Sequence, residues 1–326
     1  AIETEFFSKE QLAEGWRLAC QTIPQSDCIL HVPPESLTTL QRMQVESRNA
    51  AVPVEPAVRS YRIEMAAPGF DDLRADSRRV LEAVQQASQL PVRSIDIAVL
   101  RGISENLRSN NWQAEAAVFG DEIIALLPMG SRRLGLALDV GTTKIAGYLL
   151  DLRNGETLAS KGIMNPQISY GEDITSRIHH ALKSKDEARL LQEVVISALD
   201  RLAGELCSET GAKAEDIVDA VIVGNTAIHH LTLGLPVQPL AYPPFSAAVQ
   251  DALDIKARDI GLHLSPGAYV HVMPNIAGFV GADHISMLTA VDALAFDELT
   301  LAIDIGTNTE VSLIDKNVIY SASCAS

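Results

Sequence analysis

The chain has 326 residues, of which 47% are hydrophobic and 21% charged, so it can form two or three globular cores. Asp and Glu number 42 against 26 Lys and Arg, which gives a formal net charge of -16. A negative field of this size repels nucleic-acid phosphates and anionic lipids, and no apolar run approaches the roughly 18 residues of a membrane span. We therefore expect neither nucleic acid nor a membrane as a partner.

The cysteines indicate a reducing compartment. Cys20, Cys28, Cys207 and Cys324 are scattered and form no C-x-x-C pair, unlike the dense spacing of a disulfide framework. The first residues also lack the basic and apolar blocks of a signal peptide. We expect a cytoplasmic protein in which Cys20 and Cys324 are small apolar fillers or inert thiols. Since the chain starts at Ala1 and not at Met, we also expect it to be part of a longer protein.

The first part of the chain predicts a helix and a linker. Ser8 is a typical N-cap residue and Gln11 completes a capping box, so we expect a short helix over residues 8–20, within the segment 1–23. Residues 24–56 carry recurrent prolines among polar residues. That composition favours an extended linker over an independent core.

Two longer stretches follow, in which strand and helix patterns alternate. Residues 57–131 are expected to form a small α/β middle domain from a strand, a helix and two further apolar segments: 60–65, 71–88, 95–100 and 112–127. Residues 132–326 are expected to form a second domain, with a mixed sheet flanked by helices. Its expected helices are 174–184, 187–209, 226–233 and 278–294, with further strands at 220–224 and 269–273.

One seven-residue pattern occurs twice. Residues 136–142 read Leu-Ala-Leu-Asp-Val-Gly-Thr, and residues 301–307 read Leu-Ala-Ile-Asp-Ile-Gly-Thr. Each copy is followed by a second apolar segment, at 145–150 and 311–314. Apolar strands on both sides of a short polar turn predict a β-hairpin. The sequence therefore predicts the same strand-turn-strand unit twice.

The two turns contain the residue types of a phosphate-binding loop. Gly141 and Gly306 let the backbone approach a ligand closely, and neighbouring side chains can donate to phosphate oxygens. Asp139 and Asp304 come at the strand ends, where each could hold Mg²⁺ through water. The donors are Thr142, Thr143, Lys144, Thr307 and Asn308. Two such hairpins facing each other would clamp a triphosphate.

An ordinary tight turn is the alternative, because Asp, Gly and Thr are common turn residues. A single copy would favour that interpretation, whereas two copies in the same apolar frame favour phosphate binding. The role of Lys144 stays open, since this side chain could reach a phosphate or could be an exposed turn lysine.

The paired hairpins resemble those of the superfamily that unites actin, sugar kinases and heat-shock chaperone ATPases. Residues 15–20, 221–236, 274–283 and 323–326 narrow the resemblance, because they are similar to the ATP-dependent reductive activators of corrinoid proteins. The resemblance covers essentially the whole chain. It implies an α/β fold in which the small middle domain is followed by an actin-like (ribonuclease H-like) ATPase domain with duplicated phosphate-binding hairpins.

The resemblance also implies a task and its cofactors. Members of that family use ATP and Mg²⁺ to bring the cobalt of a corrinoid methyl-carrier protein from Co(II) to Co(I), with electrons from an N-terminal [2Fe-2S] ferredoxin domain. This chain has no C-x4-C-x2-C run, so that domain is expected upstream of Ala1 or absent. The adenosine-binding segment of the superfamily is missing too, so we expect a truncated second subdomain that binds nucleotide poorly. A corrinoid protein is the expected partner, and a homodimer stays open.

Further polar residues between and beside the hairpins are candidates for the site. Asn225 enters a predicted helix and could contact a phosphate or its attacking water, or serve as an N-cap; the resemblance favours the site. Asp283 could orient a water as a base, although the helix dipole favours a carboxylate there in any case. Glu310 lies between apolar residues and is a lesser candidate that must face solvent or the cleft. His229 and His230 point in different directions on one helix, which favours a core or surface role over a shared metal.

Two other functions fit the same hairpins. One is a small-molecule kinase, with Asp283 as the base for a substrate hydroxyl. The other is an actin-like or chaperone-like interaction module that uses nucleotide only as a conformational switch. ATP turnover that depends on an added sugar or acid would favour the kinase, and filament formation or client binding would favour the module.

Overall fold

The computed structural model describes residues 7–18, 22, 54–316 and 318–325. The chain divides into two compact units, residues 1–38 and 39–326. Cys20, Cys28 and the predicted linker as far as residue 53 lie outside the described residues.

The first unit contains the helix α1 (Lys9–Ala13). The Gln11 N–H donates to Ser8 Oγ (3.2 Å) and the Ser8 N–H donates to Gln11 Oε1 (2.9 Å), so the predicted capping box is confirmed. The predicted length is wrong, because the helix ends well before residue 20. Gly15, two residues after the helix, has a φ of 100° and takes the chain out of the helical conformation.

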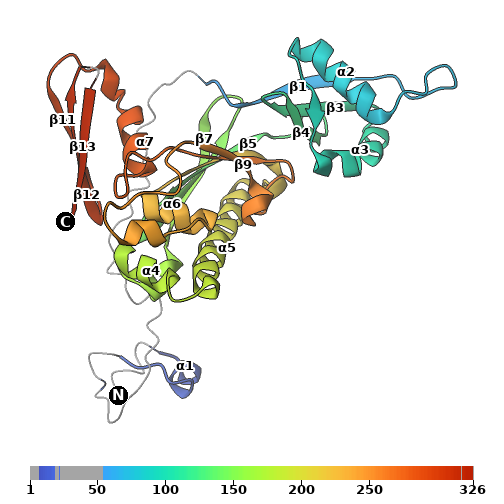
Figure 1. Ribbon diagram of the computed structural model, residues 1–326. Coiled ribbons are helices and arrows are strands. Elements are labelled where there is room, and N and C mark those ends of the chain that lie inside the picture. The colour runs from blue at the N-terminus through green and yellow to red at the C-terminus, as the bar shows by residue number, and fades with distance from the viewer. Residues whose placement is uncertain (1–6, 19–21, 23–53, 317, 326) are drawn as a thin grey trace. The chain divides into compact units, whose positions relative to one another are not determined.

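Four strands form a sheet in the order β1-β3-β4-β2, with β2 parallel to β4 and the other pairs antiparallel. The helices α2 and α3 share one apolar core with this sheet (Figure 1). The predicted apolar segment 95–100 contains the end of β2 and the start of α3, where Asp96 Oδ1 accepts from the Ala98 N–H (2.7 Å) as the N-cap. The elements are β1 (Val58–Glu64), α2 (Asp76–Ser88), β2 (Ser94–Ile95), α3 (Ile97–Ser109), β3 (Gln113–Phe119) and β4 (Glu122–Leu127).

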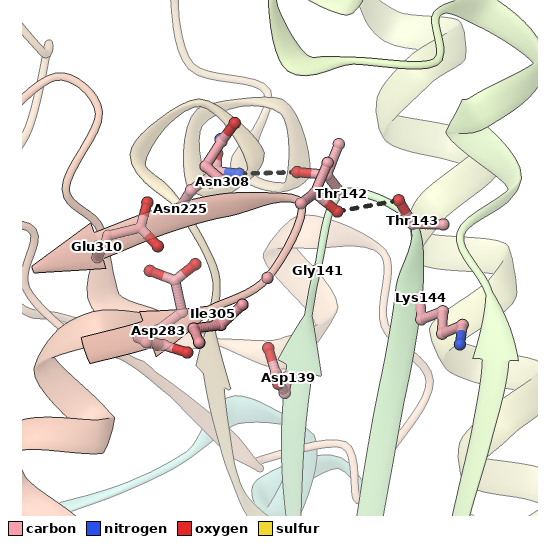
Figure 2. Close-up of a pocket in the computed structure, with 13 residues that line it drawn as sticks. Asp139, Gly141, Thr142, Thr143, Lys144, Asn225, Asp283, Ile305, Asn308 and Glu310 are labelled. Atoms are coloured by element: carbon pink, nitrogen blue, oxygen red, sulfur yellow. Dashed lines mark hydrogen bonds between the residues drawn. The ribbon is translucent and has the colours of Figure 1, made fainter. Parts of the chain in front are cut away.

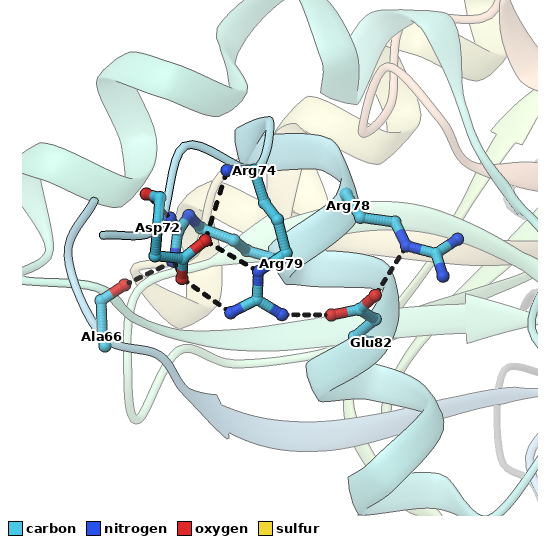
Figure 3. Close-up of polar contacts among 6 residues, drawn as sticks. All are labelled: Ala66, Asp72, Arg74, Arg78, Arg79 and Glu82. Carbon is cyan, nitrogen blue, oxygen red and sulfur yellow. Dashed lines mark hydrogen bonds and ion pairs between the residues drawn. The ribbon is translucent and has the colours of Figure 1, made fainter. Parts of the chain in front are cut away.

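An ion-pair cluster explains why α2 starts at Asp76 and not at residue 71. Asp72 accepts hydrogen bonds from Arg74 (2.7 and 2.9 Å) and from the buried Arg79 (2.6 Å), and Arg74 also reaches Glu82 (Figure 3). The Arg74 side chain holds the pKa of Asp72 well below its usual range. With its carboxylate in this cluster, Asp72 lies in a turn and does not form the first helical turn.

Six strands form the largest sheet, in the order β7-β6-β5-β8-β10-β9. The pairs β5/β8 and β8/β10 are parallel and the other pairs antiparallel, so the predicted mixed sheet is confirmed. The strands are β5 (Leu134–Val140), β6 (Lys144–Asp151), β7 (Glu156–Met164), β8 (Ile217–Val223), β9 (Leu253–Lys256) and β10 (Tyr269–Val272).

Three helices pack on this sheet and on one another: α4 (Ile174–Ala181), α5 (Lys185–Thr210) and α6 (Thr226–Leu233) (Figure 1). Leu136 and Leu138 of β5 are buried in one core with Leu199 and Leu202 of α5, and each such side chain contributes about 1.5–3 kcal/mol. No helix in the described part of the chain is long and apolar enough to cross a membrane. Short 3-10 turns lie at Pro166–Tyr170, Ala214–Asp216, Gln238–Ala241, Ala257–Ile260 and Ala293–Ala295.

The second copy of the repeat begins a separate three-stranded antiparallel sheet, in the order β11-β12-β13. Helix α7 packs against one face of this sheet. Leu301, Ile303 and Ile305 of β11 are exposed on the other face. Cys324 is exposed on β13, so it is not a core filler. The elements are α7 (Ala282–Ala290), β11 (Thr300–Ile305), β12 (Asn308–Asp315) and β13 (Val318–Ala325).

Charged and apolar contacts hold the four-stranded sheet against the six-stranded one. Lys256 of β9 lies 2.6 Å from Glu122 and 3.0 Å from Asp96, and Arg258 lies 2.9 Å from Asp96. Burial alone would raise the pKa of Asp96, but the hydrogen bonds from Arg258 and Lys256 outweigh it and lower the pKa to about 2. The apolar residues at this junction are Val58, Ala117, Ile124, Ala125 and Val218.

The adjacent histidines of α6, His229 and His230, are both buried in the core. Of the two roles predicted for them, core or surface, the core role is confirmed. Burial lowers the pKa of His229 to about 4, and Asn275 donates to its Nδ1. Because the folded-state pKa lies below the ordinary value of 6.5, the unfolded chain binds the extra proton. We expect His229 to cost about 3 kcal/mol of stability as the pH falls from 6.5 to 4.

Urea unfolding of the wild type and of His229→Asn at pH 7.5 and pH 4.5 tests this expectation. The variant should lose less stability between the two pH values than the wild type does. Equal losses in both proteins would contradict the assignment of this acid sensitivity to His229.

Candidate functional site

The two predicted hairpins are present and their turns meet. β5 and β6 pair around the turn at residues 141–143, and β11 and β12 pair around Gly306 and Thr307. Oγ1 of Thr143 lies 3.1 Å from Oγ1 of Thr307, so turns that are far apart in sequence share a hydrogen bond (Figure 2). The repeat therefore contributes both halves of one site.

Glycine is needed more strictly in the first turn than in the second. A Cβ atom on Gly141 would lie 2.7 Å from the carbonyl oxygen of Lys144, a backbone atom that cannot move aside easily. A Cβ atom on Gly306 would lie 3.3 Å from the carbonyl oxygen of Asn308. The Gly306 N–H donates to that same oxygen (3.0 Å), which closes the second turn.

A cavity of about 610 Å³ lies between the hairpins, a volume typical of a small-molecule site. All residues that the sequence predicted for the site, including the lesser candidate Glu310, line this one cavity together with Ile305. The lining is Asp139, Gly141, Thr142, Thr143, Lys144, Asn225, Asp283, Asp304, Ile305, Gly306, Thr307, Asn308 and Glu310 (Figure 2).

Four acidic side chains face this cavity: Asp139, Asp283, Asp304 and Glu310. Burial, reinforced by the charges of Asp283 and Asp304, raises the pKa of Asp139 to about 6, although its side chain still opens onto the cavity. Burial also raises the pKa of Asp283 and of Glu310, and the charge of Asp304 adds to both. A cation between these carboxylates would relieve their repulsion.

The donor set of the cavity fits Mg²⁺ that arrives with phosphate. Mg²⁺ keeps several waters and takes only one or two carboxylates in sites of this kind. Within the described ranges, no group of three or more His, Cys, Asp and Glu side chains is arranged to hold a metal alone. Asp139 and Asp304, one from each hairpin, could therefore hold the ion through its waters while phosphate oxygens complete the coordination.

Asn225 connects helix α6 to the first turn. Its Oδ1 accepts a hydrogen bond from the Ile228 N–H (3.0 Å), so the N-cap is confirmed. Its Nδ2 donates to Oγ1 of Thr142 (3.0 Å), and the residue lines the cavity. The cap thus fixes a side chain that also faces the turn, and its contact with a phosphate or an attacking water stays a prediction.

Sequence reasoning missed Asn165, which braces the first hairpin. This buried residue donates from Nδ2 to the Gly141 carbonyl (2.8 Å) and from its backbone N–H to the Thr143 carbonyl (2.9 Å). The only signal in the sequence is an Asn-Pro pair at the end of an apolar stretch, which predicts a turn and no more. Its contact with the hairpin depends on how β7 returns beside β6.

Lys144 is the first residue of β6 and lines the cavity. In Figure 2 its side chain extends away from the acidic side chains. A contact with a bound phosphate would require this side chain to turn back over the hairpin.

Comparison with known families matches most of the chain. A profile described as the RACo linker region matches residues 47–132, and one described as the RACo middle region matches residues 134–294. The first contains the four-stranded sheet, and the second contains the six-stranded sheet with the first hairpin. The second hairpin follows the matched residues.

Two curated relatives have names that refer to corrinoid proteins. The corrinoid activation enzyme RamQ of Eubacterium limosum is 28% identical over 313 residues, which is 94% of this chain and 51% of RamQ. The [Co(II) methylated amine-specific corrinoid protein] reductase of Methanosarcina barkeri is 26% identical over 200 residues, covering 59% of this chain and 36% of that protein. The chain thus spans about half the length of RamQ.

A solved structure has the same fold. The reductive activator for corrinoid,iron-sulfur protein superposes with a TM-score of 0.75 and 29% identity, covering 98% of this chain and 53% of that one. The predicted α/β class with an actin-like fold is confirmed by this match and by the paired hairpins. The chain belongs to the RACo family of reductive activators of corrinoid proteins.

Proposed function

We propose that this chain is the nucleotide-binding part of an ATP-dependent activator that reduces the cobalt of a corrinoid protein from Co(II) to Co(I). The observation that carries the proposal is the meeting of two Asp-x-Gly-Thr hairpins at one acidic cavity, in a chain of the RACo family. The names of its relatives support corrinoid cobalt as the substrate.

The residues of the cavity have three roles toward ATP: binding its phosphates, holding the metal ion and orienting the attacking water. Backbone N–H groups and hydroxyls of the two turns bind the phosphates, with Thr142, Thr143 and Thr307 as side-chain donors. Asp139 and Asp304 would hold Mg²⁺, whose charge would stabilise the negative charge on the phosphates. Asp283 orients the attacking water, whose oxygen bonds to the γ-phosphorus as the bond to ADP breaks.

Hydrolysis is coupled to a one-electron transfer. The one electron that Co(II) takes up to become Co(I) would come from a reduced [2Fe-2S] cluster in a domain upstream of this chain. Binding of ATP across both hairpins closes the two halves of the site, and this closure alters contact with the corrinoid protein. Such a reaction fits a reducing, cytoplasmic compartment.

The experiment is to mix the intact protein with a corrinoid protein in the Co(II) state and a low-potential reductant, and to record the cobalt absorption spectrum. We expect the Co(I) spectrum with MgATP, and only the Co(II) spectrum without nucleotide or with a non-hydrolysable analogue. An unchanged spectrum with MgATP would overturn the proposal. ATP turnover that appears only on addition of a sugar or an acid would favour a small-molecule kinase.

A further inference from the structure

Helix α7 carries a buried histidine next to the second hairpin. His284 is fully buried, and its Nε2 lies 2.6 Å from Oγ of Ser312 on β12. That hydroxyl lies 2.6 Å from Oγ of Ser321 on β13. These three side chains form a short hydrogen-bonded chain between α7 and the sheet.

The other ring nitrogen of His284 has no hydrogen-bond partner, although it is buried. Buried polar atoms in folded proteins are almost always hydrogen-bonded, so such an atom needs an explanation. This Nδ1 lies 4.0 Å from Oδ2 of Asp304, which lines the cavity and is 36% exposed. The unpartnered nitrogen is therefore next to a carboxylate of the proposed metal site.

The hydrogen bonds that link His284, Ser312 and Ser321 determine which ring nitrogen of His284 carries the proton. A neutral imidazole carries one N–H, and its other ring nitrogen is an acceptor. A proton on Nε2 would leave the lone pair of Nδ1 facing the Asp304 carboxylate, an unfavourable contact of two acceptors. A proton on Nδ1 lets Ser321 donate to Ser312, Ser312 donate to Nε2, and Nδ1–H point at Asp304. Only the second arrangement directs a donor at the Asp304 carboxylate and avoids a contact between two acceptors.

We propose that His284 is a positioning residue, whose Nδ1–H donates to Oδ2 of Asp304 and holds this carboxylate in its metal-binding orientation. The inference rests on the proposed function, in which Asp304 holds Mg²⁺. The 4.0 Å separation exceeds a hydrogen bond by about 1 Å, a distance that a small movement of the second hairpin onto bound phosphates would close. Removing a residue that orients a metal-binding carboxylate typically lowers metal affinity by about 10- to 100-fold.

Two substitutions separate the nitrogens of the ring. In His284→Asn the side-chain NH₂ takes the place of Nδ1, and in His284→Gln it takes the place of Nε2. Mn²⁺ affinity is measured by electron paramagnetic resonance with a non-hydrolysable ATP analogue. It should fall about 10- to 100-fold in the Gln variant and should stay within about threefold of the wild type in the Asn variant. A merely structural role would lower thermal stability in both without this difference, and equal affinities in the two variants would overturn the proposal.

The tautomer gives a readout that does not depend on turnover. Nitrogen-15 spectra of the histidine rings in the intact protein should show His284 protonated on Nδ1 with Mg²⁺ and the analogue bound. Protonation on Nε2 in that state would overturn the proposal. If His284→Gln does not fold, Ser312→Ala removes the hydroxyl that fixes the tautomer and should weaken Mn²⁺ binding in the same way. The absence of cobalt reduction, with selective weakening in the Gln variant, would refute the proposed function and leave the role of His284 standing.

Discussion

Replacing either Asp139 or Asp304 by Asn should lower Mg²⁺-dependent ATP hydrolysis by about 10²- to 10³-fold. Each substitution keeps the shape of the side chain and removes one of the two charges that hold the ion. The fold should survive, because burial, reinforced by neighbouring like charges, already raises the pKa of Asp139 to about 6. Phosphate release by the intact protein at saturating ATP and Mg²⁺ measures the effect.

Asp315→Asn is the matched control for this pair. Asp315 is an exposed aspartate at the end of β12 and does not line the cavity. Its replacement should leave turnover within about twofold of the wild type, as expected for a surface substitution. Turnover that is retained in both site variants would refute the metal role of Asp139 and Asp304.

Gly281→Ala is expected to damage both stability and activity. Gly281 has an ordinary φ of -101°, so the cost comes from contact and not from backbone strain. A Cβ atom there would lie 2.6 Å from the Gly224 carbonyl oxygen and against the Cα atom of Asn225, and backbone atoms cannot yield. Overpacking of this kind costs about 1–3 kcal/mol, which lowers Tm by several degrees in a chain of this size.

The same contact explains the effect on activity. The Ala282 N–H donates to the Gly224 carbonyl (3.0 Å), so the start of α7 is fixed directly against the residue before Asn225. Pushing the two apart would move Asp283 relative to Asn225, and a displacement of about 1 Å can cost about 10²-fold in rate. Thermal unfolding and ATP hydrolysis of the same preparation measure both effects.

Gly204→Ala serves as the control for this substitution. Gly204 lies inside α5, and a Cβ atom there would meet nothing within 4 Å. Alanine in a helix interior is more favourable than glycine by about 0.5–1 kcal/mol, so Tm should rise slightly and turnover should not change. If Gly281→Ala matched this control in Tm and in rate, the close packing of α7 against Gly224 would be refuted.

The hairpins could be predicted because their information is local. Each turn lies between apolar strands of adequate length, and the second copy repeats the first, so the structure of both hairpins followed from a few consecutive residues. The metal role of Asp139 and Asp304 stays a prediction from the same residues. Helix α6 was predicted correctly for a similar reason, since Asn225 caps it and Gly234 ends it in the left-handed conformation.

The features that could not be predicted depend on contacts between residues that are far apart in the sequence. A short apolar run such as residues 95–100 can belong to a strand or to a helix, and only the pairing of β2 with β4 decides between them. The start of α2 depended on the ion pairs of Asp72, and the bracing of the first turn depended on Asn165. The hydrogen-bonded side chains of His284, Ser312 and Ser321 likewise join α7, β12 and β13, which no local pattern connects.

The three-stranded sheet has a consequence for the colloidal behaviour of the chain. Among the described residues it presents Leu301, Ile303 and Ile305 to solvent, and β11 and β13 are its two edge strands. Flat apolar strands at a sheet edge are templates for self-association. The net charge of -16 keeps copies of the chain apart at low ionic strength, but salt shortens the reach of that repulsion to about 10 Å at 0.1 M. Added salt should therefore promote self-association of this chain through its apolar sheet.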